Sequence, residues 1–209
     1  MPTQSNELLH PNQYPREALD AYDTIDRCLK MSLHFILPGD VEIWECAAGR
    51  NCLTDSIRSL PGNRRVICAS DIAPRRAGII QHDFLKDPVP PIIIPNHWAL
   101  TNPPFHKGAV SKFAERMIEL IAAGHLEAAV LLVRHDHLQA KGRVDLLNMA
   151  DLVIAPNVRP KWYAPEAGRT SQPMWTYRWV RWTKASIAQP GNCRFRWIDQ
   201  QEVPWSEFY

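Results

Sequence analysis

The chain has 209 residues, of which 45% are hydrophobic and 22% are charged, and its formal net charge is +2. This length supports one sizeable core and is short for two, so we expect a single domain over residues 1–209. The longest apolar runs are too short to span a membrane, and the polar residues 1–7 do not resemble a signal peptide. We therefore expect a soluble, cytoplasmic protein with no membrane partner.

The five cysteines predict neither disulfide bonds nor a zinc site. Their number is odd, and no pair has the C-x-x-C spacing of common metal and redox motifs. Most lie among apolar residues, so we expect reduced thiols in the core, at Cys28, Cys46, Cys52, Cys68 and Cys193.

Positive charge is concentrated toward the C-terminal end of the chain. Residues 159–196 hold eight Lys and Arg side chains against the single acidic residue Glu166. A basic segment beside a nearly neutral body favours a polyanionic partner such as nucleic acid, and binding of that kind depends on salt. An ordinary solvated face is the alternative explanation.

The first three quarters of the chain predict alternating helices and strands. Residues 16–37 have a mostly helical pattern that stops at Pro38, so we expect an N-terminal helical segment over residues 1–38 and a core over residues 39–209. Shorter helices are predicted at 54–60 and at 113–121, the second ending before Gly124. Strands are predicted from apolar and β-branched enrichment at residues 41–47, 65–70, 98–101, 128–133 and 152–155. This alternation indicates an α/β fold with a largely parallel sheet.

Two later stretches are less regular. Residues 87–95 contain too many prolines for a central strand, which predicts a loop or an edge strand. Residues 174–183 and 193–198 both alternate like strands, and Pro190-Gly191 between them favours a hairpin. We find no internal repeat and no second domain.

The most informative motif is the box Asn102-Pro103-Pro104-Phe105, which directly follows the strand at 98–101. Consecutive prolines fix the backbone just past a strand, because proline cannot donate to a sheet ladder. The Asn102 side chain and the Pro103 carbonyl can both accept hydrogen bonds from an exocyclic NH2 group, and the Phe105 ring can stack on the heterocycle that carries it. This box predicts alkylation of an amino group.

Further candidate binding residues follow other strands, where ligands bind in doubly wound sheets. Glu45 to Gly49 form a turn of small residues after the first strand, and Asp71 follows the second, where a carboxylate can grip a ribose diol. Asp83 and Phe84 come next and suit an adenine amino group and ring. A lone Asp in such a place also commonly caps a helix. The single glycine offers no phosphate cradle, which favours ribose and adenine without a pyrophosphate.

Together these motifs resemble the amino-methyltransferases that use S-adenosylmethionine, especially small phage-type DNA adenine-N6 methyltransferases. The resemblance implies a Rossmann-like class I methyltransferase fold, with a mostly parallel seven-stranded sheet, an antiparallel C-terminal strand at the sheet edge and helices on both faces. It implies that residues 39–209 are the catalytic core, with no separate target-recognition domain. The implied catalytic residues are Asn102, Pro103, Pro104 and Phe105. The implied cofactor-binding residues are Tyr14, Glu45, Ala47, Gly49, Asp71, Ile72, Asp83, Phe84 and Asn102.

The C-terminal part of the chain also resembles these enzymes. The segment 134–138 with Gly142-Arg143, the run at 159–162 and the Trp-ending strand at 175–182 match theirs. From this resemblance and the basic charge, we predict contacts to nucleic acid by Arg143, Lys161, Trp162, Arg169 and Arg178. One departure is that the family commonly has a second glycine where this chain has Asn51.

Two patterns have simpler explanations. His135-Asp136-His137 lacks a third ligand nearby, so we expect a loop at the pocket rim and no metal site. Trp175, Tyr177 and Trp179 have the spacing of one strand face, and core packing is a better explanation than base stacking, with Arg178 and Trp182 pointing the other way.

The leading hypothesis is methylation of adenine N6 in DNA. A guanine N2 in ribosomal RNA or a glutamine amide in protein presents a similar planar NH2 group, and both remain alternatives; the basic, Trp-rich C-terminus favours nucleic acid over protein. A non-enzymatic alternative is an inactive methyltransferase fold that serves as a binding subunit, because Arg50 and Asn51 depart from the family's cofactor turn. The oligomeric state is not predicted.

Overall fold

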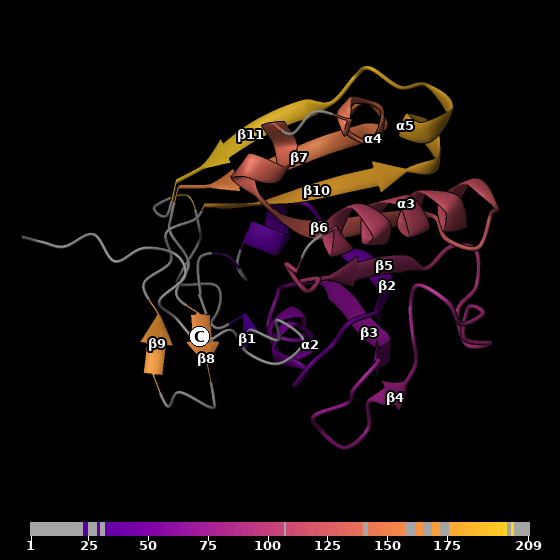
Figure 1. Ribbon diagram of the computed structural model, residues 1–209, viewed down its shortest axis with the longest axis vertical. Coiled ribbons are helices and arrows are strands. Elements are labelled where there is room, and N and C mark those ends of the chain that lie inside the picture. Colours follow the sequence, from indigo (N-terminus) through magenta and orange to yellow (C-terminus); the bar gives the residue numbers. More distant parts are fainter. Residues whose placement is uncertain are drawn as a thin grey trace, which may run out of the picture.

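The computed structural model of the protein describes residues 23–24, 29, 32–106, 108–139, 142–157, 162–164, 169–171, 176–199 and 202. Within them an eight-stranded sheet has the order β11-β7-β10-β6-β5-β2-β3-β4 (Figure 1). In chain order its strands are β2 (Asp40–Glu45), β3 (Asn63–Asp71), β4 (Ile80–Gln81), β5 (Trp98–Thr101), β6 (Ala128–Arg134), β7 (Ala150–Pro156), β10 (Tyr177–Thr183) and β11 (Arg194–Ile198). Every strand predicted from the sequence is present, and residues 87–95 form no strand, as expected.

Strand directions confirm the expected fold class and correct its details. All neighbouring strands are parallel except β10, which is antiparallel to both β6 and β7. The prediction of seven strands was one too few, because β11 adds an eighth. The antiparallel strand lies inside the sheet and not at its edge, since β7 and β11 extend the sheet beyond it. The predicted hairpin of β10 and β11 was wrong: β11 pairs with β7 in parallel.

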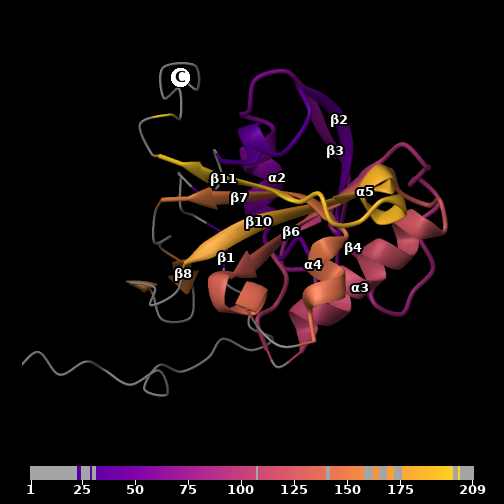
Figure 2. The same cartoon turned by 90° about the horizontal axis from the view of Figure 1, so that it is seen from above.

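Helices cover both faces of the sheet, so two separate cores form. The helix α2 (Cys52–Ile57) lies on one face, and α3 (Ala109–Ala122), α4 (Val144–Asn148) and α5 (Lys184–Ala188) lie on the other (Figure 2). Alternate residues of β6 serve the two cores, with Val130 and Leu132 facing the α2 side and Leu131 and Val133 the α3 side. None of the helices among the described residues is both long and apolar enough to cross a bilayer.

The segment before β2 packs on the α2 side of the sheet. Leu29 and Leu33 are fully buried, and the Trp179 indole donates hydrogen bonds of 3.0 Å to the Leu29 carbonyl and to Ser32 Oγ. Much of the helical segment predicted over 16–37 lies outside the described residues; of the rest, Leu29 is helical. A short strand, β1 (Asp23–Thr24), pairs with β8 (Trp162–Ala164), which pairs with β9 (Arg169–Ser171), and η3 (Ser32–Phe35) is a 3-10 turn.

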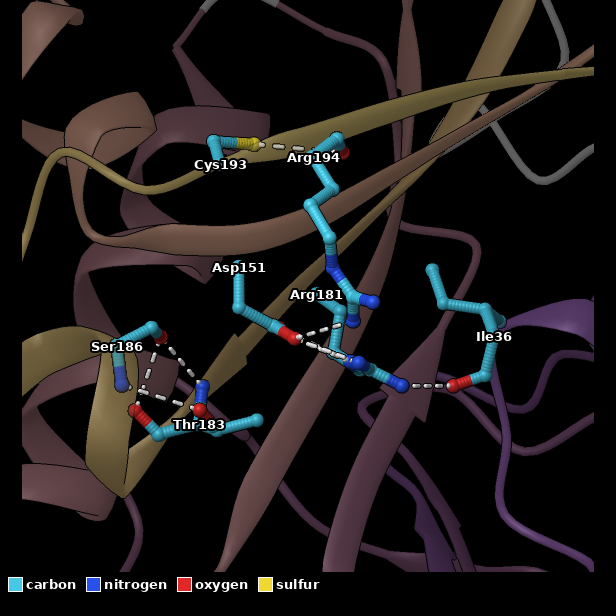
Figure 3. Close-up of polar contacts among 7 residues, drawn as sticks. All are labelled: Ile36, Asp151, Arg181, Thr183, Ser186, Cys193 and Arg194. Carbon is cyan, nitrogen blue, oxygen red and sulfur yellow. Dashed lines mark hydrogen bonds and ion pairs between the residues drawn. The ribbon is translucent and has the colours of Figure 1, made fainter.

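A half-buried ion pair ties the C-terminal half of the sheet to this segment. Arg181 of β10 donates to both carboxylate oxygens of Asp151 on β7 and, through a second guanidinium nitrogen at 2.8 Å, to the Ile36 carbonyl (Figure 3). Beside it, Thr183 and Ser186 form a reciprocal capping box at the start of α5. These contacts fix β10 between β6 and β7.

The cysteines only partly follow the expectation of core thiols. Cys46 and Cys68 are buried, and burial raises the pKa of Cys68 to about 11, which keeps it protonated. Cys52 is half-buried, and Cys193 is exposed because it precedes the edge strand β11. Cys28 lies outside the described residues.

Gly62 is required where the chain enters β3. Its φ is +96°, and a Cβ atom there would lie 2.4 Å from the backbone oxygen of Gly39. The same Gly39 oxygen accepts a 2.7 Å hydrogen bond from Asn63 N, so it cannot move away without loss. The parallel pairing of β2 with β3 therefore begins at a point where no side chain fits.

We predict that Gly62→Ala lowers the free energy of unfolding by about 3 kcal/mol, because it adds a backbone clash to an unfavourable φ. Urea unfolding measures the change. Gly78→Ala is the matched control, since its φ is +85° but nothing lies within 4 Å of a Cβ there. It should cost only about 1 kcal/mol, and equal losses in the two variants would contradict the steric argument.

Candidate functional site

The turn that follows β2 is hydrogen-bonded to the strands on both sides of it. Ala48 N donates to the Ser70 carbonyl of β3 at 2.9 Å, and Cys46 N donates to the Leu100 carbonyl of β5 at 3.3 Å. Thr101 Oγ1 also donates to the Ala47 carbonyl at 3.2 Å. The carboxyl ends of β2, β3 and β5 are therefore brought to one rigid edge.

Asn51 occupies the position where the resemblance leads us to expect a second glycine. Its φ is +67°, and it is the single non-glycine residue with positive φ in the described chain. Asparagine tolerates this left-handed conformation better than most side chains. The turn at the start of α2 thus has the backbone conformation that a glycine would give. Asn51 in place of the expected glycine is therefore weak support for an inactive methyltransferase fold.

Glu45 is a buried carboxyl group at the end of β2. It is 1% exposed, and one of its oxygens accepts hydrogen bonds from Thr54 N at 3.0 Å and from Thr54 Oγ1. Burial raises its pKa to about 8, although the bonds from Thr54 oppose that rise. Glu45 is consequently mostly neutral at physiological pH.

Asp71 holds two loops together and does not cap a helix, because residues 72–79 form no helix. Its Oδ2 accepts from Gly49 N at 2.9 Å, and its Oδ1 accepts from Ala73 N at 2.8 Å. Each carboxylate oxygen can accept a further hydrogen bond. The side chain lines the cavity described below, so the same carboxylate both holds two loops and remains available to a ligand.

Asp83 and Phe84 form the third part of the site. Asp83 Oδ1 accepts from Leu85 N at 3.0 Å, which rigidifies the loop. The Phe84 ring is 3% exposed and packs between Trp44 and Phe113, with centroid distances of 5.2 and 5.1 Å. The position of this loop is therefore set by the core on the α3 side.

The residues of the proline box lie at the end of β5. Pro103 is buried, and Asn102 and Pro104 are half-buried. The Phe105 ring packs edge-on against Tyr177 of β10, with centroids 5.2 Å apart. Phe105 thus serves partly as packing, which was one of its two predicted roles.

These elements enclose a cavity of about 190 Å³. Among the residues predicted to bind a cofactor or to catalyse, ten line it: Glu45, Ala47, Gly49, Asp71, Ile72, Asp83, Phe84, Asn102, Pro103 and Pro104. The wall also contains residues that the sequence analysis did not select, including Cys46, Cys52, Arg75, His82, His106 and Phe113. Of these, His82 could have been selected from the sequence, because it immediately precedes Asp83.

A second cavity, of about 140 Å³, lies on the other side of the box. Its lining joins Phe105 and His106 to residues from α3, β6 and the turn after it: Gly108, Val110, Arg134, Asp136, His137 and Arg143. His106 lines both cavities, so they meet at the end of the proline box.

The charges of the second cavity are fixed by their neighbours. Asp136 pairs with Arg134, and this hydrogen bond lowers the pKa of Asp136 and raises that of Arg134. Burial, with nearby Arg143, lowers the pKa of His137 to about 4 and keeps its ring neutral. Arg143 donates to the His137 carbonyl at 3.0 Å. The segment 134–138 thus forms the expected rim, and no His, Cys, Asp or Glu cluster suited to a metal occurs among the described residues.

The other predicted contacts to nucleic acid are less well placed or lie outside the description. Arg143 lines the second cavity. Arg178 is only 4% exposed, so the prediction of a direct contact by its guanidinium is not supported. Tyr14 and Lys161 lie outside the described residues, and the structure describes the backbone of Trp162 and Arg169 but not their side chains. Tyr177 and Trp179 are buried, as the core-packing interpretation predicted, and Trp175 is outside the description.

Comparisons with known proteins support the fold. No protein-family model and no curated sequence matches the chain. The solved structure of the 23S rRNA methyltransferase ErmE aligns with a TM-score of 0.50 and 15% identity, covering 77% of this chain and 69% of that protein. A Listeria monocytogenes protein, provisionally assigned as a class I S-adenosylmethionine-dependent methyltransferase, aligns with a TM-score of 0.54 and 12% identity, covering 87% and 67%. The chain therefore has the class I methyltransferase fold.

We predict that the stability of the protein falls as pH rises through the neutral range, because of Glu45. The pKa of Glu45 rises from 4.5 to about 8 on folding, so the folded protein binds more protons than the unfolded chain between these values. This stabilisation is complete below pH 4.5 and is lost toward pH 8, by up to about 1.4 kcal/mol per pH unit. Urea unfolding at several pH values measures it.

Glu45→Gln should remove most of this pH dependence, since glutamine keeps the shape and an acceptor for Thr54 but cannot ionise. Glu119→Gln, on the exposed face of α3, is the control and should leave the dependence intact. An unchanged slope in Glu45→Gln would show that another group is responsible.

Proposed function

We propose that this protein is an S-adenosylmethionine-dependent methyltransferase that acts on an exocyclic amino nitrogen, with adenine N6 in DNA as the favoured acceptor. The observation that carries the proposal is the convergence of Asn102 and Pro103 with Glu45, Asp71 and Asp83 on one cavity. These residues end or follow different strands of the sheet, and the resemblance to amino-methyltransferases assigns all of them to one reaction.

The chemistry of the cavity fits the proposed cofactor. Its three carboxyl groups suit a cationic ligand that also carries a ribose diol and an adenine amino group, and its apolar wall includes Phe84 and Leu85. Glu45 would face the methionine part, Asp71 the ribose and Asp83 with Phe84 the adenine. Bound S-adenosylmethionine would supply an electrophilic methyl group.

The protein's own contribution is positioning. Asn102 and the Pro103 carbonyl would accept hydrogen bonds from the acceptor NH2 group, which orients its lone pair and increases its electron density. The nitrogen held there would accept the methyl group that the bound cofactor supplies and would release one proton to water.

The second cavity supports placement of the acceptor ring on the far side of the box. Phe105 and His106 separate it from the cofactor cavity, and Asp136 and Arg143 offer an acceptor and a donor. A base in a duplex cannot reach such a place while stacked, so the acceptor nucleotide would be extruded or unpaired.

RNA is the second candidate acceptor. The similar fold of a 23S rRNA methyltransferase supports a nucleic acid substrate without distinguishing RNA from DNA. Guanine N2 in ribosomal RNA and a glutamine amide in protein could meet the same acceptors at Asn102 and Pro103. The binding-subunit alternative predicts no transfer at all.

We expect the purified chain to transfer a labelled methyl group to unmethylated DNA, giving a product that co-migrates with N6-methyladenine, because the box suits a planar NH2 group. Parallel reactions with RNA and with a protein extract measure the other acceptors. Label confined to RNA would shift the proposal to the second acceptor. Label confined to protein would overturn the nucleic acid assignment, and no label with any acceptor would overturn the enzymatic one.

We predict that Asn102→Ala lowers kcat by about a hundredfold to a thousandfold, since an oriented acceptor is lost, while the cofactor Kd changes little. Calorimetry with S-adenosylmethionine and single-turnover kinetics separate the two quantities. Asp71→Asn is the matched variant and should do the opposite, chiefly weakening cofactor binding. Normal turnover by Asn102→Ala would exclude its assigned role.

A further inference from the structure

The added strand β11 has an unusual surface for the edge of a sheet. Its residues Arg194, Phe195, Arg196 and Trp197 are all exposed, and only Ile198 is buried. Edge strands commonly carry charges that discourage pairing with other chains, and the arginines fit that role. Two large exposed aromatic rings do not.

The two rings form one apolar patch. Phe195 is 47% exposed and Trp197 is 59% exposed, and their rings meet edge to face with centroids 5.1 Å apart. Every other tryptophan whose side chain the structure describes is at most 8% exposed. Folding alone does not account for leaving Trp197 in water, so this ring is available to a ligand.

A buried cation lies beneath this patch. The Arg178 guanidinium carbon is 4.9 Å from the centroid of the Trp197 ring, and the side chain is 4% exposed. It donates to the Tyr177 carbonyl at 2.7 Å, its Nε has no hydrogen-bond partner, and no carboxylate among the described residues pairs with it. A buried cation without a counter-ion is costly, and an anionic or electron-rich ligand nearby would offset that cost.

The other face of β11 adds exposed positive charge. Arg194 has a side chain that is 74% exposed, and its nearest carboxylate is Asp151 at 4.0 Å. Asp151 is already bound by Arg181 at 2.5 Å, as Figure 3 shows, so it neutralises Arg194 poorly. Arg196 stacks on Phe35 at 4.9 Å and reaches Glu202 at 3.1 Å. Arg194 is therefore the charge on this strand most available to an anion.

The strand register places Trp197 and Arg178 at the edge of the sheet that carries the candidate site, whereas Arg194 lies at the other end of β11. Trp197 pairs with Ala155 near the carboxyl end of β7, and Arg178 pairs with Val133 near the carboxyl end of β6. The strands β6, β10 and β7 lie between β11 and β5, which precedes the proline box, so four strand spacings separate the two. At about 4.8 Å per strand spacing the separation is roughly 19 Å, a few nucleotides of extended strand.

We propose that the aromatic patch formed by Phe195 and Trp197 over Arg178 binds an unpaired stretch of the nucleic acid substrate beside the acceptor nucleotide, with Arg194 reaching phosphate from the other face of the same edge strand. Bases stack on the exposed aromatic rings, and Arg194 contacts phosphate. This inference rests on the proposed function for the class of partner. It also offers a way to hold substrate in a chain where no target-recognition domain was predicted, since stacking and phosphate contacts tolerate many sequences.

The test uses fluorescein-labelled single-stranded DNA and RNA of about 12 nucleotides, with binding followed by fluorescence anisotropy. Trp197→Ala should weaken binding by about fivefold to a hundredfold, because one stacked base is lost. Trp197→Phe should stay within about threefold of the wild type, since it keeps a stacking surface. Arg194→Gln should lower the slope of log affinity against log salt by about one.

Ile92→Ala is the matched control. Ile92 is 53% exposed, but it lies in the loop before β5 and not on β11, so its substitution should leave binding unchanged. Circular dichroism checks that each variant folds. Calorimetry with sinefungin measures the cofactor cavity independently, so a failure of the proposed cofactor chemistry leaves the oligonucleotide result interpretable.

Three outcomes would overturn the inference. In the first, the folded wild type binds neither oligonucleotide. In the second, Trp197→Ala and Ile92→Ala bind equally well. In the third, light scattering shows a wild-type dimer that Trp197→Ala converts to a monomer without loss of oligonucleotide affinity, which would assign the patch to a second copy of this chain. If Trp197→Ala weakens the binding of DNA only, or of RNA only, the inference is supported and that nucleic acid is identified as the ligand.

Discussion

The hydrogen bonds that hold the turn at residues 46–51 against β3 and β5 are the constraint on which the candidate site depends. Backbone groups of Cys46 and Ala48 are bonded to carbonyls of the two neighbouring strands. The Asp71 carboxylate closes the arrangement by accepting from Gly49 N. Because parallel strands end at a common edge, fixing this one turn also fixes the distances among Glu45, Asp71 and Asn102.

The two cavities that meet at the proline box differ in charge. The cofactor cavity contains the carboxyl groups of Glu45, Asp71 and Asp83, whereas the second cavity has two arginines against one aspartate. Burial of Glu45 limits the negative charge of the first cavity by keeping that group protonated. The arrangement suits a cationic ligand on one side of the box and a polyanionic ligand on the other.

The C-terminal half of the sheet is organised by a different interaction. Arg181 links Asp151 on β7 to the carbonyl of Ile36, so β10, β7 and the segment before β2 form one unit. Because β11 pairs in parallel with β7, this unit also supports β11 as the edge strand of the sheet. Among the described residues of this basic segment, Arg181 is held in a half-buried ion pair, Arg178 lies under Trp197, and Arg194 is exposed at the edge.

The sequence by itself determined the strands of the sheet and which residues meet at the candidate site. Strands such as β5 were predicted to the residue, and the order of Glu45, Asp71, Asp83 and Asn102 along the chain was enough to bring them together, because local patterns specify strands and parallel connections leave their ends at one edge. The helix at Ala109–Ala122 was recognised from its apolar spacing and from Gly124.

Tertiary structure alone decided how the C-terminal strands pair and which arginines are buried. Residues 193–198 alternate equally well as half of a hairpin or as a partner of β7, and the choice depends on contacts between residues far apart in the chain, such as Arg181 with Asp151. Nothing in the local sequence distinguishes Arg178 from an exposed arginine. In the folded sheet, however, neighbouring strands and the ring of Trp197 cover it. Burial and strand pairing are properties of the packed sheet, and no short sequence window contains them.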